Sequence, residues 1–327
     1  MMISVVGGLT TACALTGGAA TAPAVSIRPI KPVATVTAAL LAGGSMVAAS
    51  GSIWTDSSKG IQRIDPATNA VVATIPMPNS YGIGLAAGAD AVWAADFDQS
   101  VVRRIDPATN QVVATIPVGA NPAAVTVFDG NVWVANHRSG SVSRIDPSTN
   151  TVVATVKAGL VGKGGPQPIA VGFGDIWTGV SNTNSVVRID PLTNDAKANV
   201  KLRSTALACG QIAVVRSALW ISSCGVRATI SQIDPKANKA VSTVDVGGWA
   251  NGAVVNRGKA WYSVSGVDTG ITPRLVRIEP GMRKPTAIRF LAPQVKDPGA
   301  MLVAFGSLWL GYGLAGKIFR FPLNVLK

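Results

Sequence analysis

Short runs of Val, Ile, Ala and Thr recur along the chain, and Gly, Pro, Asn and Asp separate them. One example begins with "AAVTVF" and turns at Asp129-Gly130 into "NVWVAN". The polar stretch "HRSG" then leads to "SVSRI", and "DPSTN" leads to "TVVATVK". β-Branched runs bounded by such turn residues are typical of strands, and an Asp-Gly pair is typical of a tight hairpin. The pattern therefore predicts four short antiparallel strands between residues 122 and 157.

The same unit recurs along the whole chain, with successive copies 40 to 45 residues apart. Its marker "IDP" contains Asp65, Asp106, Asp146, Asp190 and Asp234, returns as "IEP" with Glu279, and survives as "FRFPL" around Phe321-Pro322. A tryptophan accompanies each copy, at Trp54, Trp93, Trp133, Trp177, Trp220, Trp261 and Trp309. Repeats of about forty residues with four strands each are the sequence pattern of propeller blades.

The two ends of the chain are complementary. Residues 32–36, "PVATV", match the fourth strand of a unit although no earlier strands precede them, and the last unit has three strands but no fourth. If the N-terminal strand completes the last blade, the ring closes and loses its open edges. We therefore predict an all-β protein in which residues 28–327 form a single seven-bladed β-propeller.

The predicted strands are apolar at successive positions, as in "VWVA" and "VVATI". A strand with one face in water would alternate apolar and polar residues, so we expect neighbouring blades to cover both faces of every strand. The repeated tryptophan is the large side chain that would fill the space between blades.

The N-terminal segment, residues 1–24, has a composition unlike that of the repeats. It contains no charged residue, is rich in Ala, Gly and Thr, and ends in Ala22-Pro23-Ala24. Small residues at such positions are typical of a signal-peptide cleavage site, so we expect export. Cys13, in "LTTACA", leaves a lipoprotein anchor open as an alternative. The segment is too short and too glycine-rich to predict a transmembrane helix.

The other two cysteines flank a predicted hairpin in "CGQIAVVRSALWISSC". A two-residue turn at Arg216-Ser217 would pair residues 215 and 218 and, further along, Cys209 and Cys224. In an exported protein this arrangement predicts a disulfide, whereas two buried thiols are the alternative.

Residues 104–136, "RIDPATNQVVATIPVGANPAAVTVFDGNVWVAN", resemble the bacterial YVTN-type β-propeller repeat and, more loosely, the propeller of streptogramin (virginiamycin B) lyases. The resemblance implies either an exported or surface-associated binding protein, or a metal-dependent lyase that opens a cyclic depsipeptide by elimination. It also implies that a lyase site would need histidine and acidic side chains near the propeller axis. This chain has one histidine, His137, and its one glutamate, Glu279, occupies the turn marker, so no lyase residue can be assigned.

A propeller binds ligands mostly at one mouth of its central channel, which is formed by the loops between blades and by the loops between second and third strands. These loops hold hydroxyl, amide and a few charged groups. The candidate ligand-binding residues are Asp56, Asp96, Asp98, Asn136, His137, Arg138, Asn182, Asn184, Trp249, Asn251 and Tyr312.

Each chemical candidate has a structural alternative. His137 could act as a general base or metal ligand, or it could be a solvated loop histidine. Asp56, Asp96 and Asp98 could hold a divalent cation through oxygen ligands, or they could be exposed carboxylates in polar loops. Trp249, in the inter-blade segment "VGGWANG", could stack on a ring or sugar, or it could anchor its loop. The sequence therefore assigns no catalytic residue, metal ligand or cofactor, and a divalent cation stays an open alternative.

Charge is distributed unevenly along the chain. Residues 1–156 contain 8 basic and 8 acidic residues, whereas residues 157–327 contain 21 basic and 8 acidic residues, which accounts for the net charge of +13. In a closed ring the later blades form one flank, so Lys201, Arg203, Arg283 and Lys284 predict an anionic envelope polymer or a protein as partner. A generally basic, soluble surface is the alternative. No motif that interleaves aromatic and basic residues predicts nucleic-acid binding, and we expect a monomer.

The preferred interpretation is an exported, non-enzymatic binding or scaffold propeller, associated with the cell envelope through its basic later blades. The alternative is a metal-dependent lyase with its site at the channel mouth, near His137 and the loop of Asp96 and Asp98.

Overall fold

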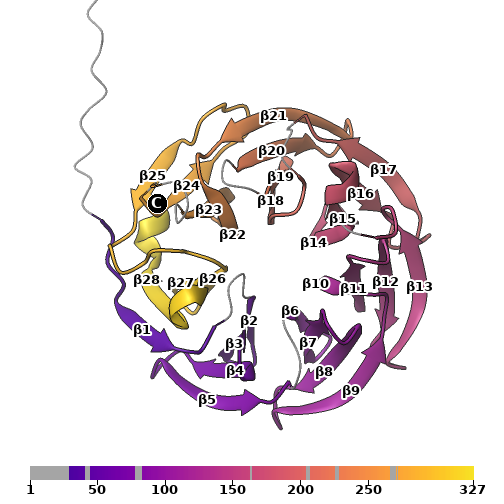
Figure 1. Cartoon of the computed structure of the whole chain (residues 1–327), viewed down its shortest axis with the longest axis horizontal. Coiled ribbons are helices and arrows are strands. Elements are labelled where there is room, and N and C mark those ends of the chain that lie inside the picture. Colours follow the sequence, from indigo (N-terminus) through magenta and orange to yellow (C-terminus); the bar gives the residue numbers. More distant parts are fainter. Residues whose placement is uncertain are drawn as a thin grey trace, which may run out of the picture.

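Seven four-stranded antiparallel sheets surround a central axis like the blades of a propeller (Figure 1). The structure, a computed structural model, describes residues 29–40, 45–77, 83–162, 164–203, 207–224, 228–265, 270 and 272–327. The proposed signal segment, Cys13 included, and the predicted domain start at residue 28 lie outside these ranges. The arrangement confirms the predicted all-β, seven-bladed propeller.

The first four blades follow one another along the chain. Blade 1 contains β2 (Met46–Ala49), β3 (Ser52–Ser57), β4 (Gly60–Asp65) and β5 (Ala70–Ile75). Blade 2 contains β6 (Ile83–Gly88), β7 (Ala91–Asp96), β8 (Val101–Asp106) and β9 (Gln111–Pro117). Blade 3 contains β10 (Pro122–Phe128), β11 (Asn131–Asn136), β12 (Ser141–Asp146) and β13 (Thr151–Lys157). Blade 4 contains β14 (Pro166–Gly172), β15 (Asp175–Val180), β16 (Ser185–Ile189) and β17 (Ala196–Lys201).

The last three blades complete the ring. Blade 5 contains β18 (Ile212–Val215), β19 (Ala218–Ser222), β20 (Thr229–Asp234) and β21 (Lys239–Asp245). Blade 6 contains β22 (Trp249–Asn256), β23 (Lys259–Ser265), β24 (Arg274–Ile278) and β25 (Ala287–Phe290). Blade 7 contains β26 (Met301–Ala304), β27 (Ser307–Tyr312), β28 (Lys317–Pro322) and β1 (Ala34–Thr37). Among the described residues, three short 3₁₀ helices span Ser181–Thr183, Gly313–Ala315 and Leu323–Leu326.

Blade 7 joins the two ends of the chain as the sequence predicts. Strand β1 pairs with β28 in antiparallel register, from Ala34 opposite Arg320 to Thr37 opposite Lys317. Ile30 also forms an isolated bridge with Leu291, next to blade 6. The first strand therefore supplies the outermost strand of the last blade and removes the edge that β28 would otherwise expose.

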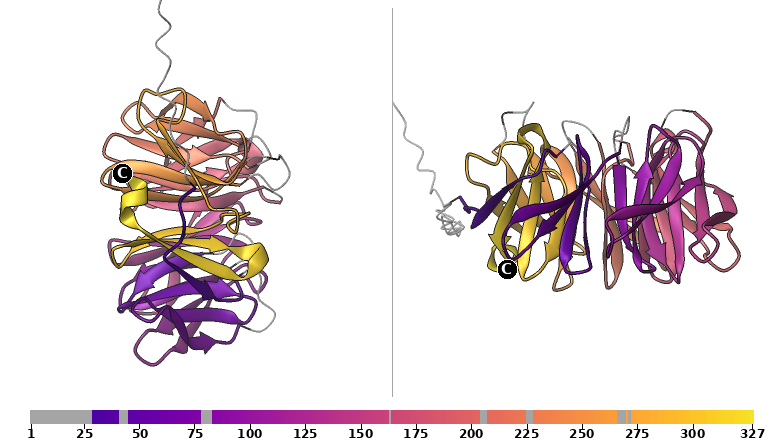
Figure 2. Two further views of the ribbon diagram at one scale, coloured as in Figure 1. Left: turned by 90° about the vertical axis from the view of Figure 1, so that its left-hand side faces the viewer. Right: turned by 90° about the horizontal axis from the view of Figure 1, so that it is seen from below.

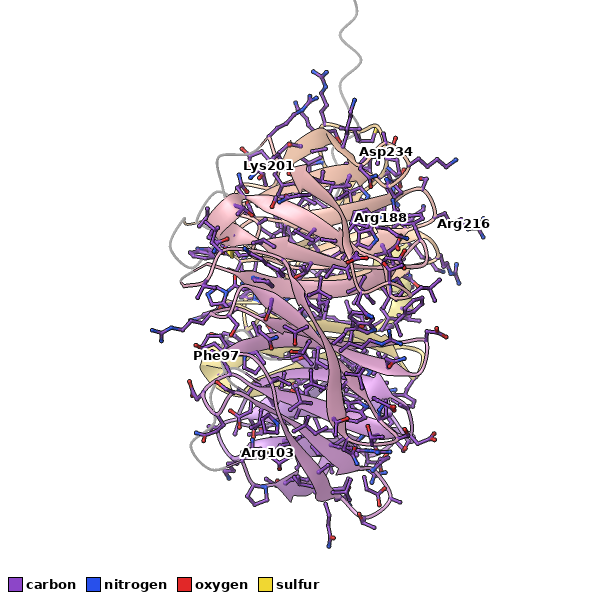
Figure 3. The ribbon with its side chains drawn as sticks, turned by 90° about the vertical axis from the view of Figure 1, so that its right-hand side faces the viewer. Phe97, Arg103, Arg188, Lys201, Arg216 and Asp234 are labelled. Carbon is purple, nitrogen blue, oxygen red and sulfur yellow. A yellow bond between two sulfur atoms is a disulfide. The ribbon has the colours of Figure 1, made fainter. Side chains whose placement is uncertain are left out.

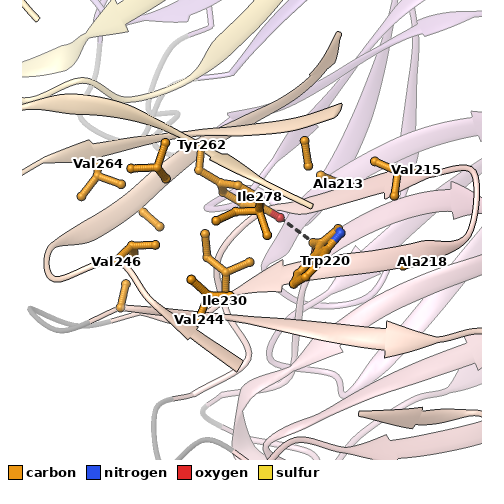
Figure 4. Close-up of a cluster of buried hydrophobic side chains, with 14 residues drawn as sticks. Ala213, Val215, Ala218, Trp220, Ile230, Val244, Val246, Tyr262, Val264 and Ile278 are labelled. Carbon is orange, nitrogen blue, oxygen red and sulfur yellow. Dashed lines mark hydrogen bonds between the residues drawn. The ribbon is translucent and has the colours of Figure 1, made fainter. Parts of the chain in front are cut away.

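The hydrophobic core lies between adjacent blades. All seven repeated tryptophans, which stand in the second strands, have no exposed surface. Figure 4 shows one such layer, between blades 5 and 6, where the Tyr262 hydroxyl donates a 2.8 Å hydrogen bond to the main-chain oxygen of Trp220. Burial of the large aromatic groups is the main source of stability that the repeat provides.

The outermost strands contradict the expectation that both faces of every strand are covered. Val72, Val113 and Val153 are 56%, 55% and 53% exposed. The blades radiate from the axis, so the space between neighbours widens toward the rim and leaves the fourth strands in contact with water. Each of these valines is the extra residue of a β-bulge. Such bulges disfavour the addition of further strands at an exposed edge.

An arginine in the third strand of six blades stacks on the tryptophan of its own blade, and in five of them it also bonds to the next blade. The guanidinium groups of Arg63, Arg104, Arg144, Arg188, Arg277 and Arg320 lie 5.0 to 5.9 Å from the ring centre of the tryptophan in the same blade. Arg63 Nη1, for example, also donates hydrogen bonds to the Pro107 carbonyl (2.7 Å) and to Asn110 Oδ1 (3.0 Å). Both acceptors lie in the turn that begins with the "IDP" marker of the next blade. Arg104, Arg144, Arg188 and Arg320 make the equivalent pair of bonds. Blade 5 has Gln232 at this position, opposite Trp220.

The disc has two distinct faces. The loops between blades and the loops between second and third strands lie at one end, which we call the upper face (Figure 2). The turns between first and second and between third and fourth strands lie at the other end, the lower face. Figure 3 shows Phe97 and Lys201 on one side and Arg216 and Asp234 on the other. In the described ranges no helix is long and apolar enough to cross a lipid bilayer.

Candidate functional site

A cavity of about 430 Å³ occupies the upper part of the central channel. The beginning of the innermost strand, or the residues just before it, lines the cavity in every blade. The seven blades contribute, among others, Ser45, Leu85, Val125, Gln167, Gln211, Ala253 and Met301. The volume lies within the range of small-molecule sites in proteins, about 300 to 1,000 Å³.

The cavity wall combines amide and hydroxyl groups with apolar side chains. Gln167, Gln211 and Ser45 supply the polar groups. Apolar lining comes from residues such as Met46, Leu85, Ile169 and Met301, with Phe97 of the loop after β7. Among the described lining residues, none has a charged side chain. This composition suits an uncharged ligand with both apolar and hydrogen-bonding parts.

Glycines allow the innermost strands to converge around the cavity. A Cβ atom on Gly84 would lie 2.9 Å from Ala124 Cα and 3.0 Å from the Ala123 oxygen, in the neighbouring blade. A Cβ on Gly252 would overlap the main-chain oxygen of Gly299. Blades 2 and 3, and blades 6 and 7, can therefore approach each other closely only because these positions have no side chain.

A buried carboxyl group stands directly behind the wall. Asp56, in β3, is 1% exposed, and its Oδ1 accepts a 2.7 Å hydrogen bond from the main-chain nitrogen of Ser45. The Ser45 hydroxyl in turn accepts a 3.1 Å bond from the main-chain nitrogen of Leu85. Burial raises the pKa of Asp56 to about 7, although the bond from Ser45 acts in the opposite direction. The carboxyl therefore changes its charge near neutral pH behind the cavity wall.

A disulfide joins Cys209 and Cys224 at the same end of the channel, with their Cα atoms 5.5 Å apart. The intervening hairpin has the predicted register, with Val215 opposite Ala218 and Ala213 opposite Trp220. Because Cys209 is itself a lining residue, the disulfide fixes part of the cavity wall.

His137 holds the loop that connects blades 3 and 4. Its Nε2 atom accepts a 3.2 Å hydrogen bond from the main-chain nitrogen of Gly164. An acceptor at Nε2 places the proton of the neutral ring on Nδ1, which is buried without a hydrogen-bond partner among the described residues. The ring lies 6.1 Å from that of Phe97, centre to centre. His137 thus reaches the cavity only through Phe97 and is not itself a lining residue.

Three candidates lie in buried strands, although the sequence pattern counted them among the loop residues of the channel mouth, Asn136 as the last residue of a predicted strand. Asp56 belongs to β3, Asp96 to β7 and Asn136 to β11. Asp96 forms an ion pair with Arg103, and Asn136 Nδ2 donates to the Ser143 hydroxyl at 2.8 Å. The second strands are longer than the apolar pattern indicates because these polar ends find partners within their own blades.

The two charged candidates that follow these strands are exposed. Asp98 and Arg138 both lie on the upper face, in the loops after β7 and β11. Within the described ranges no three His, Cys, Asp or Glu side chains come close enough together to hold a metal ion, so Asp56, Asp96 and Asp98 do not form one such group.

Amide candidates mainly secure the loops of the upper face. Asn182 Nδ2 donates a 3.0 Å bond to the Leu160 oxygen, and Asn184 ends the 3₁₀ turn of blade 4 in a left-handed conformation with φ of 45°. Asn251 Nδ2 lies within 3.5 Å of Ser265 Oγ, Asp297 Oδ1 and the Pro298 oxygen.

The two aromatic candidates belong to strands. Trp249 is the first residue of β22, paired with Ser265 and half-buried, so its placement in a loop between blades is wrong. The sequence pattern failed here because the extra residue of a β-bulge, Asn251, interrupts the strand. Tyr312 ends β27 and stacks on Phe319 with 6.3 Å between ring centres.

The structure brings none of the eleven ligand-binding candidates into the cavity wall. The lining residues come instead from the beginnings of the innermost strands. Their signal in the sequence is positional: in each repeat they precede the turn before the tryptophan strand, and several are Gly or Ala. Sequence reasoning gave priority to chemically reactive residues and so missed them.

Comparisons with known proteins support the fold. No model of a protein family matches the chain, and neither does any curated protein. Among solved structures, virginiamycin B lyase from Staphylococcus aureus is similar with a TM-score of 0.72 and 14% identity, covering 89% of this chain and 98% of the lyase. A streptogramin B lyase structure gives a TM-score of 0.68 at 15% identity, covering 87% and 94%. Hydrazine synthase from Kuenenia stuttgartiensis has a TM-score of 0.58 at 15% identity, and the match covers 74% of this chain and 76% of the hydrazine synthase chain. At this identity the likeness shows that the chain shares the propeller architecture of the lyases.

Proposed function

We propose that this protein is an exported, non-catalytic binding propeller that holds a small uncharged ligand in its central cavity and associates with the cell envelope. The observation that carries the proposal is the cavity itself, to which all seven blades contribute. Neutral oligosaccharides and small cyclic peptides combine apolar surface with hydroxyl or amide groups, and both classes match the wall.

The expected ligand contacts follow from the side chains. Gln167 and Gln211, on adjacent blades, each offer an amide that can donate and accept hydrogen bonds. Met46 and Met301 offer flexible apolar surface on blades 1 and 7. A bound ligand would therefore have its polar groups toward blades 4 and 5 and its apolar groups toward blades 7 and 1.

Export and envelope association rest on separate observations. The uncharged N-terminal segment and its small-residue end support export, and the disulfide supports folding in an oxidising compartment. The excess of basic residues in the later blades supports attraction to an anionic envelope.

Melting curves of the full chain with panels of neutral oligosaccharides and cyclic peptides test the cavity. A ligand at 100 times its dissociation constant adds about 2.7 kcal/mol of stability, which is easily detected. Gln211→Trp should abolish the shift because the indole fills the cavity from its edge. Gln111→Trp, on the exposed outer strand β9, is the matched control and should retain it. A ligand whose shift survives Gln211→Trp does not bind in the cavity and contradicts the proposal.

A lyase is the second candidate, favoured by the shared architecture with the virginiamycin B and streptogramin B lyases. It predicts turnover of virginiamycin B that requires a divalent cation and is lost with His137→Ala. Turnover with these properties would replace the binding proposal, and binding in the cavity without turnover would exclude the lyase reaction for that compound.

A further inference from the structure

The lower face is divided by charge. In blades 5 and 6 the tips of its turns, and the strand ends next to them, carry seven basic residues, Arg216, Lys236, Lys239, Arg257, Lys259, Arg283 and Lys284. The acidic residues beside them are Asp234 and Glu279, and Glu279 is already paired with Arg277 at 2.9 Å. Apart from Lys259, which lies 4.0 Å from Glu279, none of the seven forms an ion pair with a carboxylate in the described ranges.

The same face of blades 1 to 3 is acidic, and that of blade 4 carries Asp175, Asp190 and Asp195 beside Lys197. In blades 1 to 3 the turns and adjoining strand ends carry Asp65, Asp90, Asp106, Asp129 and Asp146. Hydrogen bonds from the turns lower the pKa of three of these carboxyls, Asp65, Asp106 and Asp146. They therefore stay ionised well below neutral pH, and an anionic partner is repelled from this half of the face.

Two exposed phenylalanines flank the basic turns. Phe173, between β14 and β15, is 39% exposed, and Phe305, between β26 and β27, is 41% exposed. They occupy the turn positions in blades 4 and 7, on either side of blades 5 and 6. Neither belongs to a cluster of buried hydrophobic residues in the described ranges. Met282, beside Arg283, adds a third apolar group that is 45% exposed.

The phenylalanines stand where the backbone disfavours them. Their φ angles are +55° and +49°, in the left-handed region that suits Gly, Asn and Asp. The equivalent position holds Ser50 in blade 1 and Asp129 in blade 3, with φ of +46° and +48°. A bulky side chain that is both exposed and held in an unfavourable conformation contributes little to the fold, which points to a role outside it.

We propose that the lower-face turns of blades 5 and 6, flanked by the Phe173 turn of blade 4 and the Phe305 turn of blade 7, dock onto a surface of anionic lipid headgroups. The basic turns contact the headgroup phosphates, while Phe173, Met282 and Phe305 enter the boundary between headgroups and acyl chains. Amphipathic helices that lie on membranes combine basic and apolar side chains in the same way. A flat array of turn tips meets a planar surface at many points, whereas the acidic half tilts away. The cavity mouth, on the opposite face, stays open to solvent.

This inference rests on the proposed envelope association and names the face and the partner responsible for it. Co-sedimentation of the full chain with phosphatidylcholine vesicles, with and without phosphatidylglycerol, tests it. We expect binding only with phosphatidylglycerol, and weaker binding as salt rises. Arg283→Ser/Lys284→Ser should weaken it roughly tenfold or more. Phe173→Ser/Phe305→Ser should also weaken it roughly tenfold. Serine occupies the equivalent turn position in blade 1, and Arg283 and Lys284 are exposed, so these variants should fold.

The matched control is Lys201→Ser/Arg203→Ser, which removes the same number of charges from the upper face. It should retain binding, because neither residue faces the lipid. Equal loss with this control would show attraction by overall charge alone and would overturn the proposal. So would phenylalanine variants that bind as well as wild type, or soluble polyphosphate that binds equally well regardless of the phenylalanines. If vesicle binding fails while the protein still fractionates with envelopes, only the lipid inference falls.

Discussion

Arg320 in β28 donates a 3.2 Å hydrogen bond from Nη1 to the Oδ1 atom of Asn69, 251 residues earlier in the chain. The same nitrogen donates to the Pro66 oxygen at 2.7 Å, and the guanidinium group stacks on Trp309. Between blades 1 and 2, Arg63 makes these contacts with Asn110, only 47 residues away. The junction that closes the ring is therefore built like the four junctions that join blades 1 to 5.

Arg320→Lys tests how much this closing contact stabilises the ring. Lysine keeps the charge but cannot stack as a plane or direct two bonds to the turn, so we expect a loss of about 2 kcal/mol in the free energy of unfolding. Urea denaturation measures it. Arg216→Lys, at an exposed turn, is the control and should leave the free energy of unfolding unchanged within about 0.5 kcal/mol. Equal effects of both substitutions would contradict the assigned role.

Asp56 should make stability depend on pH in a direction opposite to most carboxylates. Burial raises its pKa from 3.8 to about 7, so the folded protein holds a proton that the unfolded chain has lost between these values. The contribution of Asp56 to the free energy of unfolding therefore falls by up to about 4 kcal/mol as pH rises from about 4 to about 7. Above about pH 7 it stays constant. Asp56→Asn removes this decline. Subtracting the unfolding free energies of the two proteins at each pH isolates the effect, and a flat difference would refute it.

The disulfide should stabilise the protein and preserve the cavity wall. Replacing both cysteines by serine frees a loop of 15 residues and should lower the free energy of unfolding by about 3 kcal/mol. Because Cys209 lines the cavity, ligand binding should weaken as well. Reduction of the wild type should reproduce both changes and have no effect on the variant. Unchanged stability after reduction would show that the hairpin alone holds this wall.

Phe305→Asn should separate stability from membrane binding. Asparagine adopts the left-handed conformation more easily than phenylalanine, so the free energy of unfolding of the variant should be about 1 kcal/mol higher than that of wild type. Its binding to anionic vesicles should nevertheless decrease. Asp129→Asn, at the equivalent turn of blade 3, is the control and should change neither property appreciably. A variant that is less stable than wild type would show that Phe305 supports the fold.

The sequence predicts the architecture well because the repeated residues are those that define a blade. The tryptophans fill the layers between blades, and the turn residues fix the hairpins, so counting them counts the blades. The same repeat contains an arginine directly before each "IDP", as in Arg63 and Arg104, except in blade 5. This arginine could have predicted the contact between blades. In the sequence alone, however, an arginine beside a turn cannot be distinguished from a solvated charge, because its partners belong to the neighbouring blade.

The site was less accessible to prediction, for two physical reasons. A ligand cavity in a propeller is a property of the ring, since no single repeat contains more than a few of its lining atoms. Its wall also uses Gly84, Ala253 and similar small residues, which carry no chemical signature. The reactive residues that the sequence emphasises, such as Asp96 and His137, serve instead as internal partners of strands and loops.

Because β1 belongs to blade 7, the first strand of the propeller to be synthesised pairs with the last one. Until residues near Lys317 have been synthesised, Ala34 to Thr37 have no sheet to join, and Ile53 and Ile64 of blade 1 lack the neighbouring blade that covers them. The ring can close only after β28 has been synthesised. A product truncated before β28 would keep several well-formed blades yet expose two unpaired flanks, which would make it a natural target for quality-control proteases.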